Sequence, residues 1–447
     1  MDLTNYNHIT SNSTKVRKNS VFVSLNNNYN YILEAIQRGA SLIITNQKYD
    51  LNIKSIVVKN IDYFFSYWYQ KINNININNF KIIGVTGTDG KTTISKMLFD
   101  SINEKKRSMY IGTLGVMFYE INLKTKNTTP DIETILECFI FAKNNNIKYI
   151  IIEASSEGIL AKRLSGLKFD IVIFSNLTRE HLNTHKTMEN YFNSKKRILK
   201  LMKKNGALIT NIDDTYGARL SNDKSINYGL HKGNIHLINY EFNKNNANII
   251  LMNNKKVYYY NIPFVGMYNI YNFLAVHAAI SLLFNVDSFL FNKLTPPAGR
   301  FKVINENIII DFAHTPNALD NLLNTIKQIY NDKKIILVLG SQGEKDNSKR
   351  KYLGMVADKY CSTIILTSED PKNESLINII FDISIGIINS LYYIELSRKN
   401  AIKKAISLHK DNTVVVIVGK GMEESETIQG KVFYHSDYTC VLNSLAK

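Results

Sequence analysis

Residues 84–93 read GVTGTDGKTT, between an apolar run at 80–83 and the stretch ISKMLFDSI at 94–102, which has helical spacing. A strand, a glycine-rich loop and a helix in this order have the form of a P-loop, whose backbone N–H groups and helix dipole face a phosphate. Lys91 supplies a charge for the β- and γ-phosphates, and the hydroxyl of Thr92 can ligate Mg²⁺. The alternative, a glycine-rich turn without a ligand, does not explain why glycine, lysine and threonine follow the strand in this order. The stretch therefore predicts nucleotide binding within an α/β fold.

The length and composition of the chain limit its class. With 447 residues it exceeds one compact domain, so we expect two or three domains, each with its own core. No apolar run reaches about 18 residues, and no membrane span is expected. Residues 1–14 lack the basic and apolar regions of a signal peptide. Cys138, Cys361 and Cys440 are scattered, which fits a reducing cytoplasm without disulfides or a cysteine metal site.

The formal net charge of +17 has two explanations. It indicates either a basic surface for nucleic acid or anionic lipid, or a compositional bias toward Lys, Asn, Ile and Tyr. The lysines are dispersed, with short clusters at 194–197 and 203–204, and no basic helix or aromatic platform stands out. We therefore expect bias and no nucleic-acid partner, with part of the charge available to attract small anionic substrates.

The first 79 residues read as a small α/β module. An amphipathic helix is predicted at 31–40 with Gly39 as its C-cap, and the Asn-rich stretch 73–79 reads as a linker. The strands of this module are predicted at 20–25, 41–45 and 55–60.

Strand and helix signals alternate after this linker. Continuous apolar runs that end in polar residues suit buried parallel strands with functional groups at their C-terminal ends. Such runs lie at 149–156, 169–177, 207–214, 307–314, 334–341, 362–370 and 412–421. The segment 236–263 alternates and predicts an antiparallel edge, and 267–286 reads as a helix. A break at 295–299 separates a central P-loop ATPase domain with a mostly parallel sheet, 80–296, from a C-terminal Rossmann-like α/β domain, 297–447.

Polar side chains at predicted strand ends beside the loop indicate a metal site. Glu153 ends the run YIIIE, and His181 follows FDIVIFSNLTRE. A carboxylate and an imidazole at this edge can hold a divalent ion that bridges nucleotide and substrate. Two other interpretations are weaker. Glu153 would be an acid at a helix N-terminus, and His181 with His185 would be a zinc pair, which lacks a following Glu and a third ligand.

Two further groups lie at strand ends. Asp311 ends the run NIIID, where a carboxylate can accept hydrogen bonds from ribose hydroxyls; a cap before the turn at Pro316 is the alternative. Ser155 and Ser156 lack the G-x-S-x-G surroundings of a nucleophile elbow, so hydrogen bonding to a substrate is the better interpretation.

Together these motifs resemble one family, the Mur ligases, and most closely its UDP-N-acetylmuramoyl-tripeptide synthetase branch. The resemblance extends from residue 81 to the C-terminus and is weak before it. A chance match to so many motifs in order is not expected. It rests on GVTGTDGKTT (84–93), NTTPD (127–131), EASSEG (153–158), NLTREHLNTH (176–185), YFNSKKRIL (191–199), NIDD (211–214), GMYNIYN (266–272), AGRF (298–301), DFAHTPNAL (311–319), GEKDNSKR (343–350), SEDPKNE (368–374) and GKGMEES (419–425).

The resemblance implies that ATP and Mg²⁺ bind in the central domain. Lys195 lies where the family has a carbamylated lysine, although from the sequence alone it would be a solvated helix lysine. The implied catalytic residues are Lys91, Lys195, His181 and Glu153, and the implied metal ligands are Thr92, Glu153, His181 and Lys195 as a carbamate. The residues implied to contact ATP are Gly87, Thr88, Asp89, Gly90, Lys91, Thr92, Thr93, Asn269, Arg300 and Asp311.

The resemblance also implies a UDP-MurNAc-dipeptide and a free amino acid as substrates of ATP-dependent amide formation through an acyl phosphate. We expect a monomer in the cytoplasm of a bacterium. The residues implied to hold the UDP substrate are Ser13, Asn127, Thr128, Thr129, Ser155 and Arg163. Those implied to hold the amino acid are Lys345, Glu369, Asp370, Pro371, Lys372, Gly419 and Glu423.

The chain departs from the family pattern in several places. Asp89 replaces the usual Asn of the loop, Glu157 the usual His, and Ala161 the usual Gln. The N-terminal D-S-R pattern is Asn-Ser-Thr at 12–14. These positions lie at sites implied to contact ATP or the UDP substrate.

The added amino acid is predicted from two cations. Diaminopimelate-adding members carry D-N-P-R, whose Arg grips the distal carboxylate; here the stretch is Glu369–Lys372, and the companion Arg of G-D-R-D is Lys345. Both cations persist without the bidentate fork. A lysine pair still suits a distal carboxylate, so diaminopimelate is expected, with lysine or another amino acid as the alternative.

Three other functions remain open from the sequence. They are a Mur-like amide ligase with another acyl substrate, such as a folylpolyglutamate-like enzyme, a non-catalytic nucleotide-binding protein, and a nucleic-acid-binding NTPase. NTTPD and DFAHTP favour the peptidoglycan branch. Lys91 and the implied metal ligands argue against a protein without catalysis.

Overall fold

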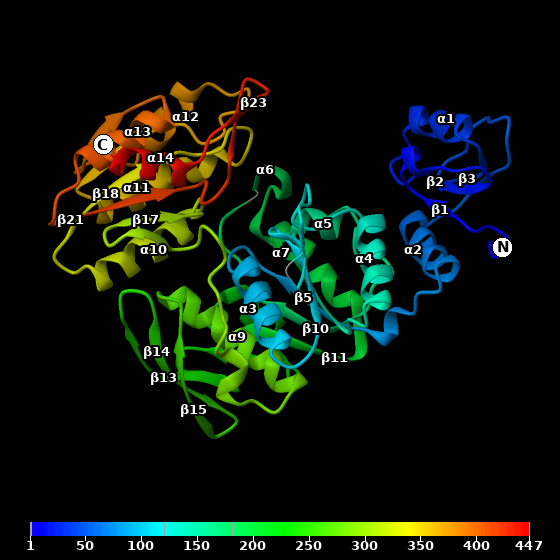
Figure 1. Ribbon diagram of the computed structural model, residues 1–447, viewed down its shortest axis with the longest axis horizontal. Helices are drawn as coiled ribbons and strands as arrows, with labels where there is room; N and C mark the ends of the chain where they lie inside the picture. The colour runs from blue at the N-terminus through cyan, green and yellow to red at the C-terminus, as the bar shows by residue number, and fades with distance from the viewer. Residues whose placement is uncertain (1, 120, 181, 447) are drawn as a thin grey trace.

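The computed structural model describes residues 2–119, 121–180 and 182–446. Three larger sheets and a separate hairpin divide this part of the chain. In Figure 1 the N-terminal sheet lies at the right in blue, the C-terminal sheet at the upper left in yellow to red, and the central sheet between and below them. The predicted α/β class, with a small first module followed by two larger sheets, is confirmed. Within the described ranges, no helix has the length and apolar character needed to cross a membrane.

The first sheet is parallel and runs in the order β1-β2-β3-β4. Its elements are β1 (Ile9–Thr10), the 3₁₀ helix η1 (Ser13–Lys15), β2 (Ser20–Val23), α1 (Tyr29–Gln37), β3 (Ala40–Thr45), β4 (Ser55–Val57), α2 (Ile61–Ile72) and the 3₁₀ helix η2 (Ile77–Asn79). The predicted helix is α1, but its C-cap is Arg38, and Gly39 takes φ +95° one position after the cap. The sequence pattern does not predict α2, because its tyrosines and phenylalanines favour strands; packing against α4 supports it.

The central sheet runs in the order β15-β14-β13-β12-β11-β10-β5-β9-β6-β7-β8. Its strands from β13 to β6 pair in parallel, and antiparallel strands follow at both ends. Its strands are β5 (Lys81–Thr86), β6 (Ser108–Gly112), β7 (Gly115–Phe118), β8 (Ile121–Leu123), β9 (Tyr149–Glu153), β10 (Phe169–Phe174), β11 (Met202–Asn211), β12 (Ile226–Gly229), β13 (Ile235–Phe242), β14 (Ala247–Asn253) and β15 (Lys256–Ile262). The antiparallel edge predicted at 236–263 is therefore confirmed.

Helices cover both faces of the central sheet. Neighbouring residues of β5 show this, because they point to opposite faces and belong to two different hydrophobic cores. Ile83 packs with α3 and α9, whereas Ile82 packs with α4 and α7. Burial on both faces explains why the parallel strands read as continuous apolar runs. The helices are α3 (Lys91–Asn103), α4 (Ile132–Asn144), α5 (Ser156–Leu160), α6 (Leu182–His185), α7 (Met188–Lys196), η3 (Arg197–Leu201), α8 (Thr215–Leu220), α9 (Met267–Leu283) and η4 (Ser288–Phe291).

The C-terminal sheet runs in the order β16-β17-β21-β18-β19-β20 and is parallel except for its first pair. Its strands are β16 (Lys302–Asn305), β17 (Ile308–Asp311), β18 (Lys334–Leu339), β19 (Thr363–Leu366), β20 (Leu391–Ile394) and β21 (Thr413–Val418), and the separate hairpin is β22 (Ser425–Ile428) with β23 (Lys431–Tyr434). The helices are α10 (Pro316–Ile329), η5 (Asn347–Lys349), α11 (Arg350–Tyr360), α12 (Leu376–Ser384), α13 (Arg398–Ser407) and α14 (Asp437–Leu445).

One acidic side chain fixes the first module on the central part. Glu133 on α4 is buried and accepts hydrogen bonds from Thr10 Oγ1 at 2.7 Å, Ser11 N at 2.7 Å and Ser11 Oγ at 2.6 Å. Hydrogen bonds to a charged acceptor are stronger than neutral ones. This contact gives the small module a defined position beside α4.

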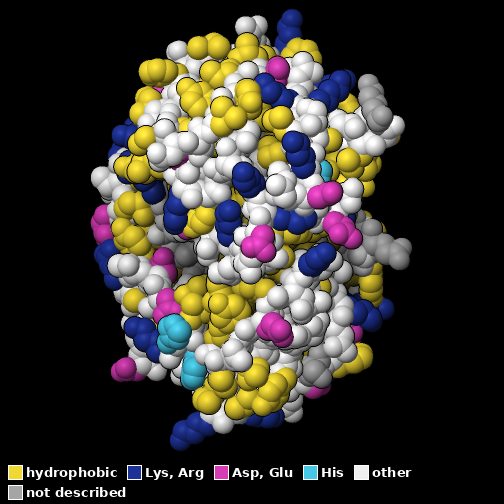
Figure 2. Space-filling view, turned by 90° about the vertical axis from the view of Figure 1, so that its left-hand side faces the viewer, with side chains coloured by type: hydrophobic (Ala, Val, Ile, Leu, Met, Phe, Trp, Pro, Cys, Tyr) yellow, Lys and Arg dark blue, Asp and Glu magenta, His cyan; other side chains and the backbone are white. Residues whose placement is uncertain are grey.

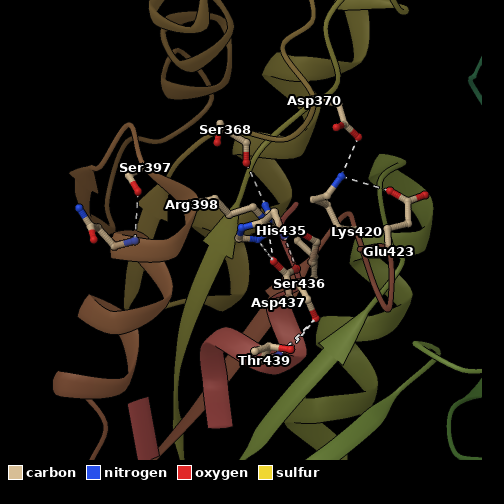
Figure 3. Close-up of polar contacts among 12 residues, drawn as sticks. Ser368, Asp370, Ser397, Arg398, Lys420, Glu423, His435, Ser436, Asp437 and Thr439 are labelled. Atoms are coloured by element: carbon tan, nitrogen blue, oxygen red, sulfur yellow. Dashed lines mark hydrogen bonds and ion pairs between the residues drawn. The ribbon is translucent and has the colours of Figure 1, made fainter. Parts of the chain in front are cut away.

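A buried ion pair between α13 and α14 contacts backbone carbonyls of the C-terminal sheet region (Figure 3). The side chains of Arg398 and Asp437 have no exposed surface. Arg398 donates to both carboxylate oxygens of Asp437, at 2.8 and 2.7 Å, and to the carbonyl oxygens of Ser368 at 3.0 Å and Val418 at 2.7 Å. Burial alone would raise the pKa of Asp437, but Arg398 and His435 lower it to about 2.

We expect Arg398→Met to lower the free energy of unfolding at pH 7 by about 3–5 kcal/mol, because it leaves the Asp437 carboxylate buried without its cation. Urea unfolding measures the change. Since the folded-state pKa of Asp437 is depressed, its contribution is present above its ordinary pKa and is lost as the pH falls toward 2. The double variant Arg398→Met/Asp437→Asn should recover part of the loss. An unchanged unfolding midpoint in the single variant would contradict this prediction.

Candidate active site

The phosphate loop follows β5 and ends at the first residue of α3, as the sequence predicts. Gly87 and Gly90 take φ values of +150° and +85°. A Cβ at Gly87 would lie 1.9 Å from Ser175 Oγ, and one at Gly90 would lie 2.4 Å from Asn272 Oδ1. Both positions therefore exclude a side chain. No side chain at Gly90 caps α3, so the first N–H groups of this helix can face a phosphate.

Two lysines meet at one carbonyl of the loop. Lys91 Nζ donates to Gly87 O at 2.9 Å and to Thr88 O at 2.7 Å, and Lys195 Nζ donates to the same Gly87 O at 2.6 Å. Lys195 is almost fully buried near the end of α7. Burial, reinforced by the charge of Lys91, holds the pKa of Lys195 well below its usual value. Burial also lowers the pKa of Lys91, although Glu153 and Asp89 oppose the shift.

Glu153 ends β9 fully buried among donors. Its Oε2 accepts from Thr92 Oγ1 at 3.0 Å and Thr113 Oγ1 at 3.1 Å. Its Oε1 accepts from Thr113 N at 3.1 Å and from the hydroxyl of Tyr110. A threonine hydroxyl next to a carboxylate is a hard oxygen donor set that fits Mg²⁺.

The structure does not place all of the predicted metal ligands. His181, and with it the pair that it would form with His185, lies outside the described residues. Within the part of the chain that is described, no three or more His, Cys, Asp and Glu side chains are grouped to hold a metal ion. Mg²⁺ commonly takes one or two carboxylates and completes its shell with water and substrate phosphates, so Thr92 and Glu153 still fit it.

The carboxylate of Asp89, the replacement within the loop, contacts side chains outside the loop. Its Oδ2 accepts from Thr178 Oγ1 at 3.2 Å and from Asn317 Nδ2 at 3.3 Å. Asn317 lies in the first turn of α10, in the C-terminal part. The extra negative charge therefore contacts the neighbouring part of the protein.

A cavity of about 1250 Å³ is lined by both the central and the C-terminal parts. It brings together most of the residues that the sequence assigns to ATP, the UDP substrate and the amino acid. The predicted residues in its lining are Thr88, Asp89, Gly90, Lys91, Thr92, Thr93, Asn127, Thr128, Ser155, Arg163, Lys195, Asn269, Arg300, Asp311, Lys345, Gly419 and Glu423.

Three other predicted residues, Gly87, Thr129 and Glu153, do not line the cavity but contact residues that do. Gly87 receives the two lysines, and Glu153 holds Thr92. Thr129 Oγ1 donates to Glu153 O at 2.7 Å, and Thr129 O accepts from Arg163 Nη1 at 2.8 Å. These residues position neighbours that do reach the cavity.

The remaining predicted residues lie apart from the lining. Ser13 Oγ donates to Glu34 Oε2 at 2.7 Å inside the first module. Glu369 is buried below Gly419, whose Cβ would lie 2.1 Å from Glu369 Oε2. Burial raises the pKa of Glu369 to about 7 against the nearby cations. Asp370, Pro371 and Lys372 form the loop beside it and are also outside the lining described for the cavity.

The carboxylate of Asp311, which the sequence assigns to ATP, accepts hydrogen bonds from two backbone N–H groups. Asp311 Oδ2 accepts from Phe301 N at 2.6 Å, and Oδ1 accepts from Ala313 N at 2.7 Å. Burial raises the pKa of Asp311, while Arg300 opposes the shift. The guanidinium of Arg300 lies 5.0 Å from the ring centre of Phe312. Asp311 thus orders the loop that presents Arg300, and its contact with a ribose stays a prediction.

A buried ion pair joins the central and C-terminal parts beside the cavity. Lys349 Nζ in η5 donates to the carboxylate of Glu180 at 3.1 and 3.4 Å. Both residues are buried, and Glu180 also lines the cavity. Close by, Asp346 Oδ2 accepts from Leu182 N at 3.3 Å. These contacts hold the two parts together around the cavity.

Sequence reasoning missed three residues that shape the site. Thr113 directly follows β6, so the strand-end rule that identified Glu153 would have found it. Lys420 lies within the quoted motif GKGMEES, but its role depends also on Asp370, which is 50 positions away in the chain. Arg398 has no local signal, because the backbone carbonyls that it contacts, those of Ser368 and Val418, are 30 and 20 positions away in the chain.

The positive net charge is spread over the face drawn in Figure 2. Lys and Arg side chains lie there singly, among hydrophobic and neutral side chains. On this face these side chains are dispersed and not gathered into one stripe, and the origin of the charge in composition stays a prediction.

Known proteins resemble this chain over nearly its whole length. Residues 85–280 match the Mur ligase middle domain, and residues 299–421 match the Mur ligase, glutamate ligase domain. A UDP-N-acetylmuramoyl-L-alanyl-D-glutamate--2,6-diaminopimelate ligase from Fusobacterium nucleatum is 31% identical over 97% of this chain and 92% of its own. A protein of the same name from Parabacteroides distasonis is 34% identical over 96% of this chain and 92% of its own.

Solved structures agree with the sequence matches. A structure described by the same ligase name has a TM-score of 0.69 and 25% identity, and covers 99% of this chain and 95% of its own. The MurF ligase from Thermotoga maritima in complex with ADP has a TM-score of 0.69 at 17% identity, over 99% and 98% of the two chains, which shows a shared fold. Two family domains match this chain, and relatives that carry the same ligase name match nearly its full length. This chain therefore belongs to the Mur ligase family.

Proposed function

We propose that this chain is an ATP-dependent ligase that joins 2,6-diaminopimelate to UDP-N-acetylmuramoyl-L-alanyl-D-glutamate, a step of peptidoglycan precursor synthesis. One observation carries the proposal: relatives bearing the name of that ligase are 31% and 34% identical over nearly the full chain. The cavity supports it, because the phosphate loop and most of the residues proposed to hold the two other substrates line one space. The same similarity favours this substrate over the other acyl substrates that the sequence left open.

The reaction would proceed in two steps. An oxygen of the D-glutamyl carboxylate attacks the γ-phosphorus of ATP, the bond to the ADP oxygen breaks, and an acyl phosphate forms. The free amine of the amino acid then attacks the acyl carbon, loses a proton and expels inorganic phosphate, leaving an amide. Lys91 and the N–H groups at the start of α3 would stabilise the charge on the transferred phosphoryl group. For this, Lys91 Nζ exchanges its loop carbonyls for phosphate oxygens.

Thr92 and Glu153, together with His181, are proposed to hold Mg²⁺. When bound, Mg²⁺ would neutralise phosphate charge and orient the phosphates. Lys195 is proposed to carry a carbamate, because burial beside Lys91 favours its neutral amine, the form that reacts with CO₂. The carbamate would replace a cation with an anionic oxygen donor, which suits a site that holds a divalent cation.

Different parts of the cavity lining are proposed to bind different substrates. Asn269, Arg300 and Asp311 are proposed to hold the nucleoside of ATP. The proposed contacts of the UDP substrate are Ser13, Asn127, Thr128, Thr129, Ser155 and Arg163. Lys345, Gly419 and Glu423 form what we call the C-terminal wall of the cavity, to which Lys345 brings a positive and Glu423 a negative charge, and these charges match a zwitterionic amino acid. The buried pair of Glu180 and Lys349 would keep this wall closed and exclude water.

We further propose that residues 1–79, 80–296 and 297–447 act as three domains within one working chain. The lining of the cavity by one chain supports a monomer. The cytoplasm is the proposed location, because its substrates would be ATP and a nucleotide-linked precursor. The relatives compared above come from bacteria.

Phosphate release from ATP tests this function. With Mg²⁺ and UDP-MurNAc-L-Ala-D-Glu present, we expect release with diaminopimelate and little with lysine, ornithine or glutamate. Omitting the nucleotide dipeptide or the amino acid should abolish release in each case. Release with lysine alone would reject diaminopimelate as the substrate. No release with any amino acid, from a protein that still binds ATP, would reject the ligase proposal.

A further inference from the structure

Lys420 connects Glu423, which lines the cavity, to Asp370 in the neighbouring loop (Figure 3). It follows Gly419 at the end of β21, and its side chain has no exposed surface. Its Nζ donates to Asp370 Oδ2 at 2.7 Å and to Glu423 Oε2 at 3.2 Å. Burial alone would lower the pKa of Lys420, but its hydrogen bond to Asp370 and the charges of Asp370 and Glu423 raise it, so the ammonium stays charged. A buried ammonium needs such partners.

The loop that Lys420 holds has a strained backbone. Asp370 and Lys372 take φ values of +46° and +53°, in the left-handed region that residues other than glycine seldom enter. Strain of this kind persists where the surrounding structure enforces it. Asp370 Oδ1 accepts from Thr427 N at 2.8 Å, and Lys372 N donates to Thr427 O at 3.0 Å. Lys420 and β22 therefore hold the loop from two sides.

The other partner of Lys420 reaches the cavity. Glu423 lines it and has a side chain 45% exposed, whereas that of Asp370 is 14% exposed. The position of Glu423 depends on the ammonium of Lys420, which is itself bound to Asp370 in the strained loop. Lys420 thereby fixes Glu423 relative to the loop that carries Lys372.

We propose that Lys420 is a positioning residue for the amino-acid substrate: by anchoring Glu423 to the loop at 370–372, it sets the place of Glu423 in the cavity for recognition of the distal, zwitterionic end of diaminopimelate. This inference rests on the proposed function. It also gives Asp370 a role as an anchor of the wall, since Lys420 and Thr427 occupy its carboxylate. A substrate with charged groups at both ends gains most from walls held at a fixed separation.

The test is the KM for diaminopimelate in Lys420→Met, which keeps an unbranched apolar side chain and removes the ammonium. We expect this KM to rise at least about tenfold, the loss that corresponds to one charge-assisted hydrogen bond. The KM values for ATP and for the UDP substrate should change less than about twofold, since a selective KM increase marks lost substrate binding. Lys420→Arg should recover part of the affinity. Lys431→Met, on the exposed strand β23, is the matched control.

Asp370→Ala provides a second route if Lys420→Met unfolds, which thermal unfolding and ATP binding would reveal. It should raise the KM for diaminopimelate similarly, and the double variant should add little, because both changes break one link. An unchanged KM in folded Lys420→Met or Asp370→Ala overturns the inference, and so does an equal rise in all three KM values. Absence of diaminopimelate-dependent phosphate release from the unaltered protein would instead refute the proposed function.

Discussion

Lys91→Ala is expected to reduce ADP formation at least about 10²–10³-fold, the loss typical when one preorganised donor to a charged transition state is removed. Lys91 is the first residue of α3, and its ammonium folds back onto the carbonyls of Gly87 and Thr88. A γ-phosphate at the start of this helix would lie within its reach. Alanine preserves the helix, so the change removes the charge and little else.

The measurement is ADP release with all three substrates present, and ATP binding is followed separately by equilibrium titration. Lys106→Ala is the matched control, because Lys106 is an exposed lysine beyond the other end of α3. Lys91→Arg should stay well below the unaltered rate, since a planar guanidinium does not replace a compact ammonium at a point contact. Turnover of Lys91→Ala close to that of the unaltered protein would contradict the role of the loop in phosphoryl transfer.

The phosphate loop could be predicted from the sequence because every determinant is local. Strand, glycines, lysine and helix lie within residues 80–102, and the positive φ values occur at the two glycines where they are needed. The parallel strands were also predictable, since burial on both faces makes each one a continuous apolar run. The hairpin strands β13 to β15 followed from their alternating pattern.

Features that depend on distant partners could not be predicted in the same way. Glu180 and Lys349 form a buried pair across 169 positions, and neither has a local pattern that marks it. The aromatic content of α2 concealed a helix that packing against α4 supports. For Lys195, sequence indicated a solvated lysine, whereas the chain places it almost fully buried against the loop carbonyl of Gly87. Only the family resemblance identified its position, and the fold supplies the physical reason.

That reason leads to the second large effect, in Lys195→Ala. We expect turnover to fall at least about 100-fold, with partial recovery when a short carboxylic acid such as acetate is added. Burial beside Lys91 lowers the pKa of Lys195 and so favours its neutral amine, which can form a bond to CO₂ and release a proton to become a carbamate. Added acetate would supply the missing carboxylate-like oxygens in the space left by the truncated side chain.

Three comparisons separate a carbamate from a lysine that merely packs. Lys195→Arg keeps a positive charge but cannot become an anion, so it should be as inactive as Lys195→Ala and gain nothing from acetate. Lys196→Ala is the control, because this exposed neighbour lies one position further along α7. Removing dissolved CO₂ should lower the activity of the unaltered protein, and bicarbonate should restore it. Full activity in Lys195→Arg would show that the site works with a cation at this position, because a guanidinium stays protonated at every accessible pH.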